Sequence, residues 1–287
     1  MPIRSLWRCT RFGLAATASG LVLSLAADPS AAQFSYTDFG STAGLELRSH
    51  AAQAGNRLRL TPAQPNSSGA AWRTDRQRVV FGFDTIFRYQ ITPSPDAEPG
   101  DGFAFVVQNS PEGVDFVPPH GGFLGYNLMR NSLAVEFDTF KNSWDSGDNQ
   151  IGVHTRGDGP NYSNDGSLFD AVLGKTGTIP ELDDGLEHTV RVSYLPGILS
   201  VYFDDLATPV LSVSTNLKAL GLHNGKAFVG FTSGTGTALA DHDILSWSFE
   251  SHPVPEPGAC ALGTGLFLFA AALFRRRARA LAPARRR

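Results

Sequence analysis

Short segments in which apolar and polar residues alternate recur along residues 33–252, and no long stretch between them has the apolar spacing of a helix. Alternation with a period of two places successive side chains on opposite faces of a β-strand. Stretches rich in Gly, Pro and Asp separate these segments, as turns do. The segments cover residues 57–61, 79–92, 102–108, 133–140, 151–155, 188–195, 198–205, 226–233 and 243–251.

So many strands exceed the needs of a small barrel and favour an all-β fold, in which two large antiparallel sheets pack face to face. The dipeptide Pro196-Gly197 predicts a hairpin between two of the segments. Residues 216–222 predict a single helical turn. The long loops at 93–101, 110–122 and 233–243 are expected to gather at one end of the sandwich and to carry its site.

Residues 1–32 are typical of a secretory signal peptide. Three arginines precede an apolar run over residues 12–27, and small residues follow it. Polar residues and glycine dilute the run too much for a membrane anchor. We therefore expect cleavage after Ala32 and export of a domain over residues 33–252.

Residues 253–287 form a second segment of distinct composition. Pro255, Glu256 and Pro257 come first, an apolar span follows from Gly258 to Phe274, and arginines dominate the end. The span is at the short limit for a transmembrane helix, and the arginines after it would stay cytoplasmic. This order resembles the PEP-CTERM sorting signal of Gram-negative bacteria. The resemblance implies anchoring in the inner membrane, processing by an exosortase-type enzyme, and delivery to the cell surface or an extracellular matrix.

The charge balance of the body differs from that of the whole chain. The two end segments hold ten of the 24 basic residues but only two of the 27 acidic ones, which leaves the body with a formal net charge of −11. This charge favours cations as partners and argues against nucleic acid, whose phosphates need basic side chains. Both cysteines, Cys9 and Cys260, lie in the end segments, so the body contains no disulfide and no thiolate ligand.

Carboxylates are concentrated in one stretch of the body, LAVEFDTFKNSWDSGDNQIGVHT. Glu136 and Asp138 share one face of a predicted strand, and Asp145 and Asp148 lie in the loop that follows. Unpaired acids at this spacing repel one another, and a solvated strand face is the simple alternative. Calcium would remove the repulsion, since it binds carboxylate, amide and backbone carbonyl oxygens together.

The segment VEFDTFKN and the IGV after it resemble the metal loop of the legume-type (L-type) lectins, which have a concanavalin A-like β-sandwich. Further similar segments follow the order of that family over roughly residues 34–250. They are RLRLT, GFDTIFRYQI, GDGFAFVVQ, GGFLGYN, VGFTSGTG and DHDILSWSF. The resemblance implies a jelly-roll fold that binds carbohydrate with the help of metal ions.

The resemblance also implies which residues bind metal. Calcium would be held by Asp138, Asn142, Asp145 and the carbonyl oxygen of Phe140. A second divalent ion such as Mn²⁺ would be bound by Glu136 and bridged to calcium by the two aspartates.

One residue departs from the family pattern for the second ion. Its histidine ligand falls at Gln150, and a glutamine amide is a poorer ligand for a transition metal. His154 lies on the same strand face four residues further on, too far to replace the missing histidine without distortion.

For the sugar, the resemblance implies an aspartate after a cis peptide that accepts bonds from two hydroxyls, a glycine N–H that donates to the same pair, and an aromatic ring against the sugar. An asparagine that also binds calcium would donate to a hydroxyl, and a variable loop would set specificity. The aspartate is Asp101, the glycine is Gly121 or Gly122, and the aromatic ring is that of Phe140. The asparagine is Asn142, and the variable loop contains Gly236, Thr237 and Ala238.

Two other functions are compatible with this fold. Some glycoside hydrolases with the same sandwich place Glu, Asp and Glu along one strand, but Lys141 stands where the general acid would be. A structural matrix protein could keep the fold without binding sugar. We expect an exported, non-enzymatic, calcium-dependent lectin whose ligand is a glycan such as an exopolysaccharide.

Overall fold

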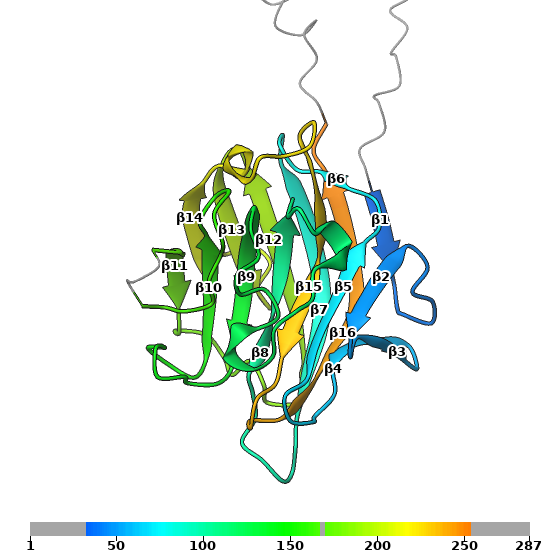
Figure 1. The fold of residues 1–287 in the computed structure, drawn as a ribbon, viewed down its shortest axis with the longest axis vertical. Coiled ribbons are helices and arrows are strands. Elements are labelled where there is room, and N and C mark those ends of the chain that lie inside the picture. The colour runs from blue at the N-terminus through cyan, green and yellow to red at the C-terminus, as the bar shows by residue number, and fades with distance from the viewer. Residues whose placement is uncertain (1–32, 167–169, 254–287) are drawn as a thin grey trace, which may run out of the picture.

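The computed structural model describes residues 33–166 and 170–253. They form two antiparallel sheets packed face to face (Figure 1), which confirms the predicted all-β sandwich. The expected leader and the segment from residue 254 onward, with its apolar span, lie outside the described residues. Within the described ranges, no helix is long and apolar enough to cross a membrane.

The first sheet has eight strands in the order β14-β13-β12-β7-β16-β4-β3, and β1 pairs with β16 in addition. Its strands are β1 (Gln33–Tyr36), β3 (Ala52–Ala54), β4 (Arg57–Thr61), β7 (Phe83–Pro93), β12 (Glu187–Leu195), β13 (Gly197–Phe203), β14 (Leu211–Thr215) and β16 (Ala240–Ser251).

The second sheet also has eight strands, in the order β11-β10-β9-β8-β15-β5-β2, with β6 paired to β15. Its strands are β2 (Leu45–Ser49), β5 (Ser68–Arg73), β6 (Gln77–Arg78), β8 (Gly102–Gln108), β9 (Ser132–Asp138), β10 (Gln150–Thr155), β11 (Val172–Thr176) and β15 (Lys226–Gly234). Three short 3₁₀ helices, η1 (Gly113–Asp115), η2 (Gly121–Phe123) and η3 (Leu217–Leu220), connect strands of the described chain.

An aromatic core holds the two sheets together. Phe87 on β7 contacts four rings of the facing sheet, with centroid separations of 5.0 to 6.2 Å. Each such pair adds about 0.5–1.5 kcal/mol beyond simple burial. The contacts fix β7 against β8, β9 and β15, which carry the predicted site at their ends. The four rings belong to Phe103, Phe105, Phe137 and Phe231.

Most of the predicted elements are present. The hairpin at Pro196-Gly197 joins β12 to β13, and η3 lies where a helical turn was expected. The segment 79–92, predicted as a long strand or a bent pair, forms a strand only from Phe83 onward, because the N–H groups of Val79 and Val80 bond to the carbonyl of Gly225. Strands without clear alternation, such as β5 with its small residues, were missed.

The predicted loops meet at one end of the sandwich, at the bottom of Figure 1. Asp101 N–H donates to Gly234 O over 3.2 Å, Gly121 N–H to Thr235 O over 3.0 Å, and Leu239 N–H to the carbonyl of residue 98 over 2.7 Å. Only the second half of the loop over 110–122 lies at this end, so the prediction for that loop was correct only in part. Its first half follows the far end of β8, where Gly113 lies against Phe228.

The two ends of the described chain lie together at the opposite end. Gln33, the first described residue, pairs with Glu250 near the end of β16. Figure 1 shows this pair of strand ends at the top, with the length of the sandwich between it and the loop cluster.

Candidate functional site

Strand β9 delivers the predicted carboxylates to the loop end. Asp138 is its last residue, and it lies between Gly102 of β8 and Gln150 of β10 in the sheet register. Glu136 points to the same side, two residues further from the edge. Both side chains are buried, with 1% of Glu136 and 4% of Asp138 exposed. The alternative of a solvated strand face is therefore wrong.

The loop after β9 folds back on these acids. Phe140 N–H donates to Asp138 Oδ1 over 3.2 Å, and Asn142 N–H donates to Asp145 Oδ2 over 2.9 Å. Oδ1 of Asp145 is buried and has no hydrogen-bond partner among the described residues. Asp138, Asn142 and Asp145 thus belong to one folded loop, and carboxylate and amide oxygens are ligands that calcium takes.

The raised pKa values of the two aspartates in this loop also fit a cation-binding site. Burial, followed by the charges of Glu136 and Asp145, raises the pKa of Asp138 well above its usual range. Burial raises the pKa of Asp145 to about 7, although the bond from Asn142 N–H opposes the shift. Within the described chain neither acid forms an ion pair with Lys or Arg. A divalent cation would favour both ionised forms.

Asp101 stands beside this loop after a cis peptide bond to Gly100, as the resemblance implied. Only 3% of the residue is exposed, and Oδ2 has no well-aligned hydrogen-bond partner among the residues that the structure describes. Burial raises the pKa of Asp101 to about 6, while the Gly236 N–H and the Asn142 side chain lower it. Asp101, Asn142 and Gly236 therefore come together from three separate loops.

The glycines and the aromatic ring of the predicted sugar site lie in the same place. A β-carbon on Gly122 would lie 2.1 Å from Asn142 Oδ1, so only glycine fits against that amide. A β-carbon on Gly100 would lie 2.8 Å from that of Phe140 and 2.9 Å from that of Ala238. All predicted sugar-site residues therefore adjoin one rim. Of the other two, Thr237 is exposed on this rim and Gly121 bonds to Thr235.

Gln150 differs from the role implied for it. Its Nε2 donates to Asp138 Oδ2 over 3.2 Å and to Asp165 Oδ2 over 2.9 Å, while its oxygen accepts a bond from Ser146. The amide thus turns its donors, not its oxygen, to the carboxylates. This arrangement does not fit Gln150 as a metal ligand.

The expectation for His154 also needs correction in part. It does not replace Gln150 beside Asp138, yet its Nε2 lies 2.7 Å from Glu136 Oε1. The register explains this reach, since Gly152 is opposite Glu136 and His154 is the diagonal neighbour on the same face. Spacing along one strand does not reveal such a diagonal contact.

Several residues near the site were missed from the sequence. Tyr126, Asp165 and Lys175 reach the acid cluster from three other segments, and no local pattern marks them. Trp144 stacks on Phe123 at 6.2 Å beside the rim. A tryptophan is conspicuous in a loop of Asp, Ser and Gly, so Trp144 could have been recognised from the sequence as a residue of the rim.

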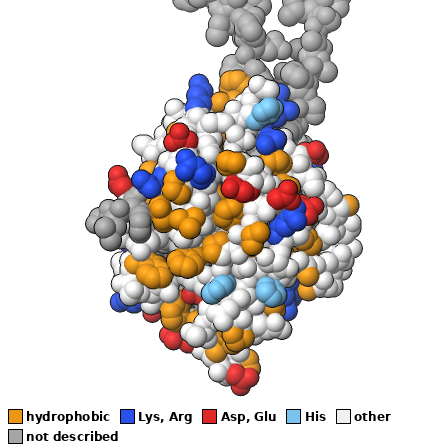
Figure 2. All heavy atoms as spheres, viewed as in Figure 1, with side chains coloured by type: hydrophobic (Ala, Val, Ile, Leu, Met, Phe, Trp, Pro, Cys, Tyr) orange, Lys and Arg blue, Asp and Glu red, His pale blue; other side chains and the backbone are white. Residues whose placement is uncertain are grey.

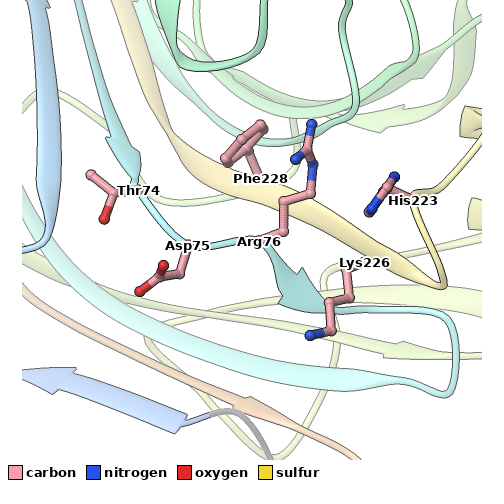
Figure 3. A pocket seen from close by; sticks show the side chains of 6 residues that line it. All are labelled: Thr74, Asp75, Arg76, His223, Lys226 and Phe228. Carbon is pink, nitrogen blue, oxygen red and sulfur yellow. The ribbon is translucent and has the colours of Figure 1, made fainter.

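A cleft lies at the other end of β15. It has a volume of about 490 Å³ and is lined by the six side chains shown in Figure 3, with Arg76 over the ring of Phe228 at 4.1 Å. It shares no residue with the predicted site. The face in Figure 2 mixes acidic, basic and apolar side chains.

Comparison with known families decides the classification. The family model described as "Legume lectin domain" matches residues 31–260. The chain belongs to the legume lectin family. Among curated relatives, Lectin 8 of Medicago truncatula is 30% identical over 202 residues, which span 64% of this chain and 70% of that protein. A putative L-type lectin-domain receptor kinase of Arabidopsis thaliana, I.11, is 31% identical over 76% of this chain but only 35% of the kinase.

Several solved structures share the sandwich. A lectin from Bauhinia forficata, solved in complex with GalNAc, has a TM-score of 0.64 and 23% identity, and the match covers 79% of this chain and all of that chain. The lumenal domain of VIP36, solved with Ca²⁺ and Man3GlcNAc, has a TM-score of 0.60 and 18% identity over 78% of this chain and 91% of that chain. At these identities the likeness establishes the lectin fold.

Proposed function

We propose that this legume lectin domain binds carbohydrate in a calcium-dependent manner and carries out no covalent chemistry. The observation that carries the proposal is the convergence of Asp101, Asn142 and Gly122 on one rim, beside two buried aspartates that form no ion pair with Lys or Arg within residues 33–166 and 170–253. Similar structures solved with GalNAc or with Ca²⁺ and a mannose-containing glycan support it.

Calcium would be held by Asp138, Asn142, Asp145 and the carbonyl oxygen of Phe140. When bound, the ion would supply a fixed charge that holds the loop and keeps both aspartates ionised. The chain's own residues would then bind the sugar. Asp101 would accept from two adjacent hydroxyls, Asn142 and the N–H of Gly122 would donate, and the Phe140 ring would cover the apolar face of the sugar. The N–H of Gly121 does not take this role, because it donates to the carbonyl of Thr235.

The surroundings of Glu136 argue against the glycoside hydrolase alternative. Tyr126 donates to its Oε2 over 2.6 Å, and His154 lies against its Oε1. With 1% of the residue exposed, a glycosidic bond cannot reach this carboxylate. The absence of an acid at position 141 points the same way.

A glycan array probed with and without a chelator tests the proposal. We expect binding that is lost with chelator, restored by Ca²⁺, and abolished by Asp101→Asn. The matched control is Asp96→Asn, which changes an exposed aspartate in the loop before the site and should bind like wild type. A calcium-dependent rise in melting temperature without binding to any glycan would instead favour a structural matrix protein.

We further propose that residues 1–32 direct export and that the segment around Pro255, Glu256 and Pro257 directs sorting by an exosortase-type enzyme, with the inner membrane as a transient anchor. The ligand would then be the cell's own exopolysaccharide at the surface or in the matrix. A strain that lacks this polysaccharide should release the protein into the medium. Equal retention in both strains would contradict the idea.

A further inference from the structure

A second polar cluster lies deeper on the same face of β9 and β10. Nε2 of His154 is 2.7 Å from Glu136 Oε1 and 3.8 Å from Asp165 Oδ1. The three ligand atoms lie within 4.8 Å of one another. The side chains of His154, Glu136 and Asp165 are 0%, 1% and 2% exposed, so this cluster is enclosed by protein.

Each of the three side chains is held in place through its other polar atom. His154 Nδ1 lies 2.9 Å from the carbonyl oxygen of Tyr162 and must donate to it, which leaves Nε2 for another partner. Tyr126 donates to Glu136 Oε2 over 2.6 Å. Metal-binding histidines and carboxylates are commonly oriented by outer partners in this way.

Asp165 follows the same pattern. Gln150 Nε2 donates to its Oδ2 over 2.9 Å, and Lys175 pairs with the same oxygen. Its Oδ1 has no hydrogen-bond partner in the described chain, and neither has His154 Nε2, even though Glu136 lies close by. A buried oxygen without a partner, and a ring nitrogen whose close neighbour is Glu136 Oε1 at 2.7 Å, therefore face one point, where a ligand would satisfy both.

The backbone leaves this point open. Gly152 lies opposite Glu136 in the ladder between β9 and β10. A β-carbon there would lie 2.8 Å from both Glu136 Oε1 and His154 Nε2. Glycine thus keeps free a space that any other residue would fill.

We propose that Glu136, His154 and Asp165 bind a transition-metal ion such as Zn²⁺ or Mn²⁺. One imidazole and two carboxylates form a ligand set that suits these ions, whose bonds to nitrogen and oxygen are about 2.0–2.2 Å long. Small side-chain rotations would bring all three atoms to that distance. The imidazole disfavours Ca²⁺, which takes oxygen ligands.

The site is distinct from the one that the family pattern implies. There the second ion would bind Glu136, Asp138, Asp145 and the residue at Gln150. Here the donors of Gln150 stand between Asp138 and Asp165, so the two metal sites share no aspartate. The inference does not rest on sugar binding.

Metal content of the purified full-length protein tests the inference. After dialysis against Ca²⁺ and Zn²⁺ and then metal-free buffer, mass spectrometry should find one zinc per chain. His154→Gln and Asp165→Asn should each weaken zinc binding at least about 100-fold while calcium content is unchanged. Gln150→Ala removes the residue at the family position and only an orienting bond to Asp165, so it should weaken zinc binding less than His154→Gln does. Asp148→Asn, which changes an exposed aspartate of the loop after β9, is the matched control and should keep zinc. In the Co²⁺-loaded protein, X-ray absorption should show one imidazole ligand, lost in His154→Gln.

Two results would overturn the inference. Zinc that is lost in Gln150→Ala but kept in His154→Gln would place the ion at the family position. A calcium-loaded wild type that takes up no transition metal would show that a proton shared between His154 and Glu136 takes the place of an ion. Calcium content and melting temperature report whether each variant is folded. If His154→Gln does not fold, Asp165→Asn still tests the inference, because Asp165 lies in a loop rather than in a strand.

Discussion

Asp243 and Asp145 are both buried carboxylates, but they differ in whether basic side chains balance their charge. Asp243 accepts bonds from Arg59 through both oxygens, each over 2.8 Å, and Arg57 lies 3.4 Å away. Asp145 has one backbone donor and a free buried oxygen. The first charge is balanced within the fold, so its role is structural. The charge of Asp145 has no ion-pair partner among the described residues, which suits a bound cation.

The strongest test of this contrast is Asp145→Asn. It removes one charged ligand from the proposed calcium loop but little volume, so the calcium dissociation constant should rise on the order of 10³-fold, which corresponds to about 4 kcal/mol. Isothermal titration with Ca²⁺ measures this change. Because the apo site carries unpaired negative charge, the melting temperature of the apo protein should not fall. Calcium affinity equal to that of wild type would remove Asp145 from the site.

Arg59→Ala probes the balanced carboxylate. It leaves the buried Asp243 with Arg57, 3.4 Å away, as its remaining basic partner, which should lower the free energy of unfolding by about 3 kcal/mol. Urea denaturation measures the loss. Calcium affinity should not change, in contrast to Asp145→Asn. A variant as stable as wild type would show that the Arg59 pair contributes little to folding.

The pH dependence of stability, measured with and without calcium, tests whether the charge of Asp145 is unbalanced in the fold. The pKa of Asp145 is about 7 in the fold, against 3.8 as its ordinary value, so the folded apo protein binds more protons than the unfolded chain between these pH values. The stability of the apo protein should therefore fall as pH rises from 5 to 8. Asp101, with a pKa of about 6, and His154, whose pKa is also raised, act in the same direction, whereas His242, whose pKa burial lowers to about 4, opposes them below its ordinary value of 6.5.

Saturating calcium should reverse this trend. It binds the ionised aspartates, so its stabilisation should grow over the same pH range and reach about 2.7 kcal/mol at a hundred times the dissociation constant. Thermal melts at pH 5, 6, 7 and 8, with calcium and with chelator, give both curves. An apo protein whose stability rises with pH would contradict the assigned acid behaviour.

The smallest expected effect is that of Phe140→Ala. Its ring is half-buried at the rim, and its proposed metal contact is through the backbone. Glycan affinity should fall about fivefold, or about 1 kcal/mol, while calcium affinity stays within twofold of wild type. Loss of calcium binding would show that the ring supports the loop rather than the sugar.

The fold and the rim could be predicted because both are encoded in short, ordered segments. The alternation in RLRLT and HTVRVSYL marks strands, and GDGFAFVVQ and VEFDTFKN carry Asp101, Asp138 and Asn142 at fixed places within strand ends. The resemblance of these segments to a family then supplied the pairing of loops that are far apart in the chain.

The deeper cluster could not be predicted in the same way. It depends on a diagonal contact across β9 and β10, which brings His154 to Glu136, and on Asp165 from a loop without a pattern. Cross-strand register and loop path arise from tertiary packing, and spacing within one strand does not contain them. Strands such as β5 and β11 were missed because they lack clear apolar alternation.

The pairing of Gln33 with Glu250 has a consequence for the protein as a tethered molecule. A tether attached at either terminus would hold the sandwich upright with its binding end directed outward, so that many copies on one surface could grip the same polymer at once. Linked weak contacts of this kind raise overall attachment far above that of a single copy.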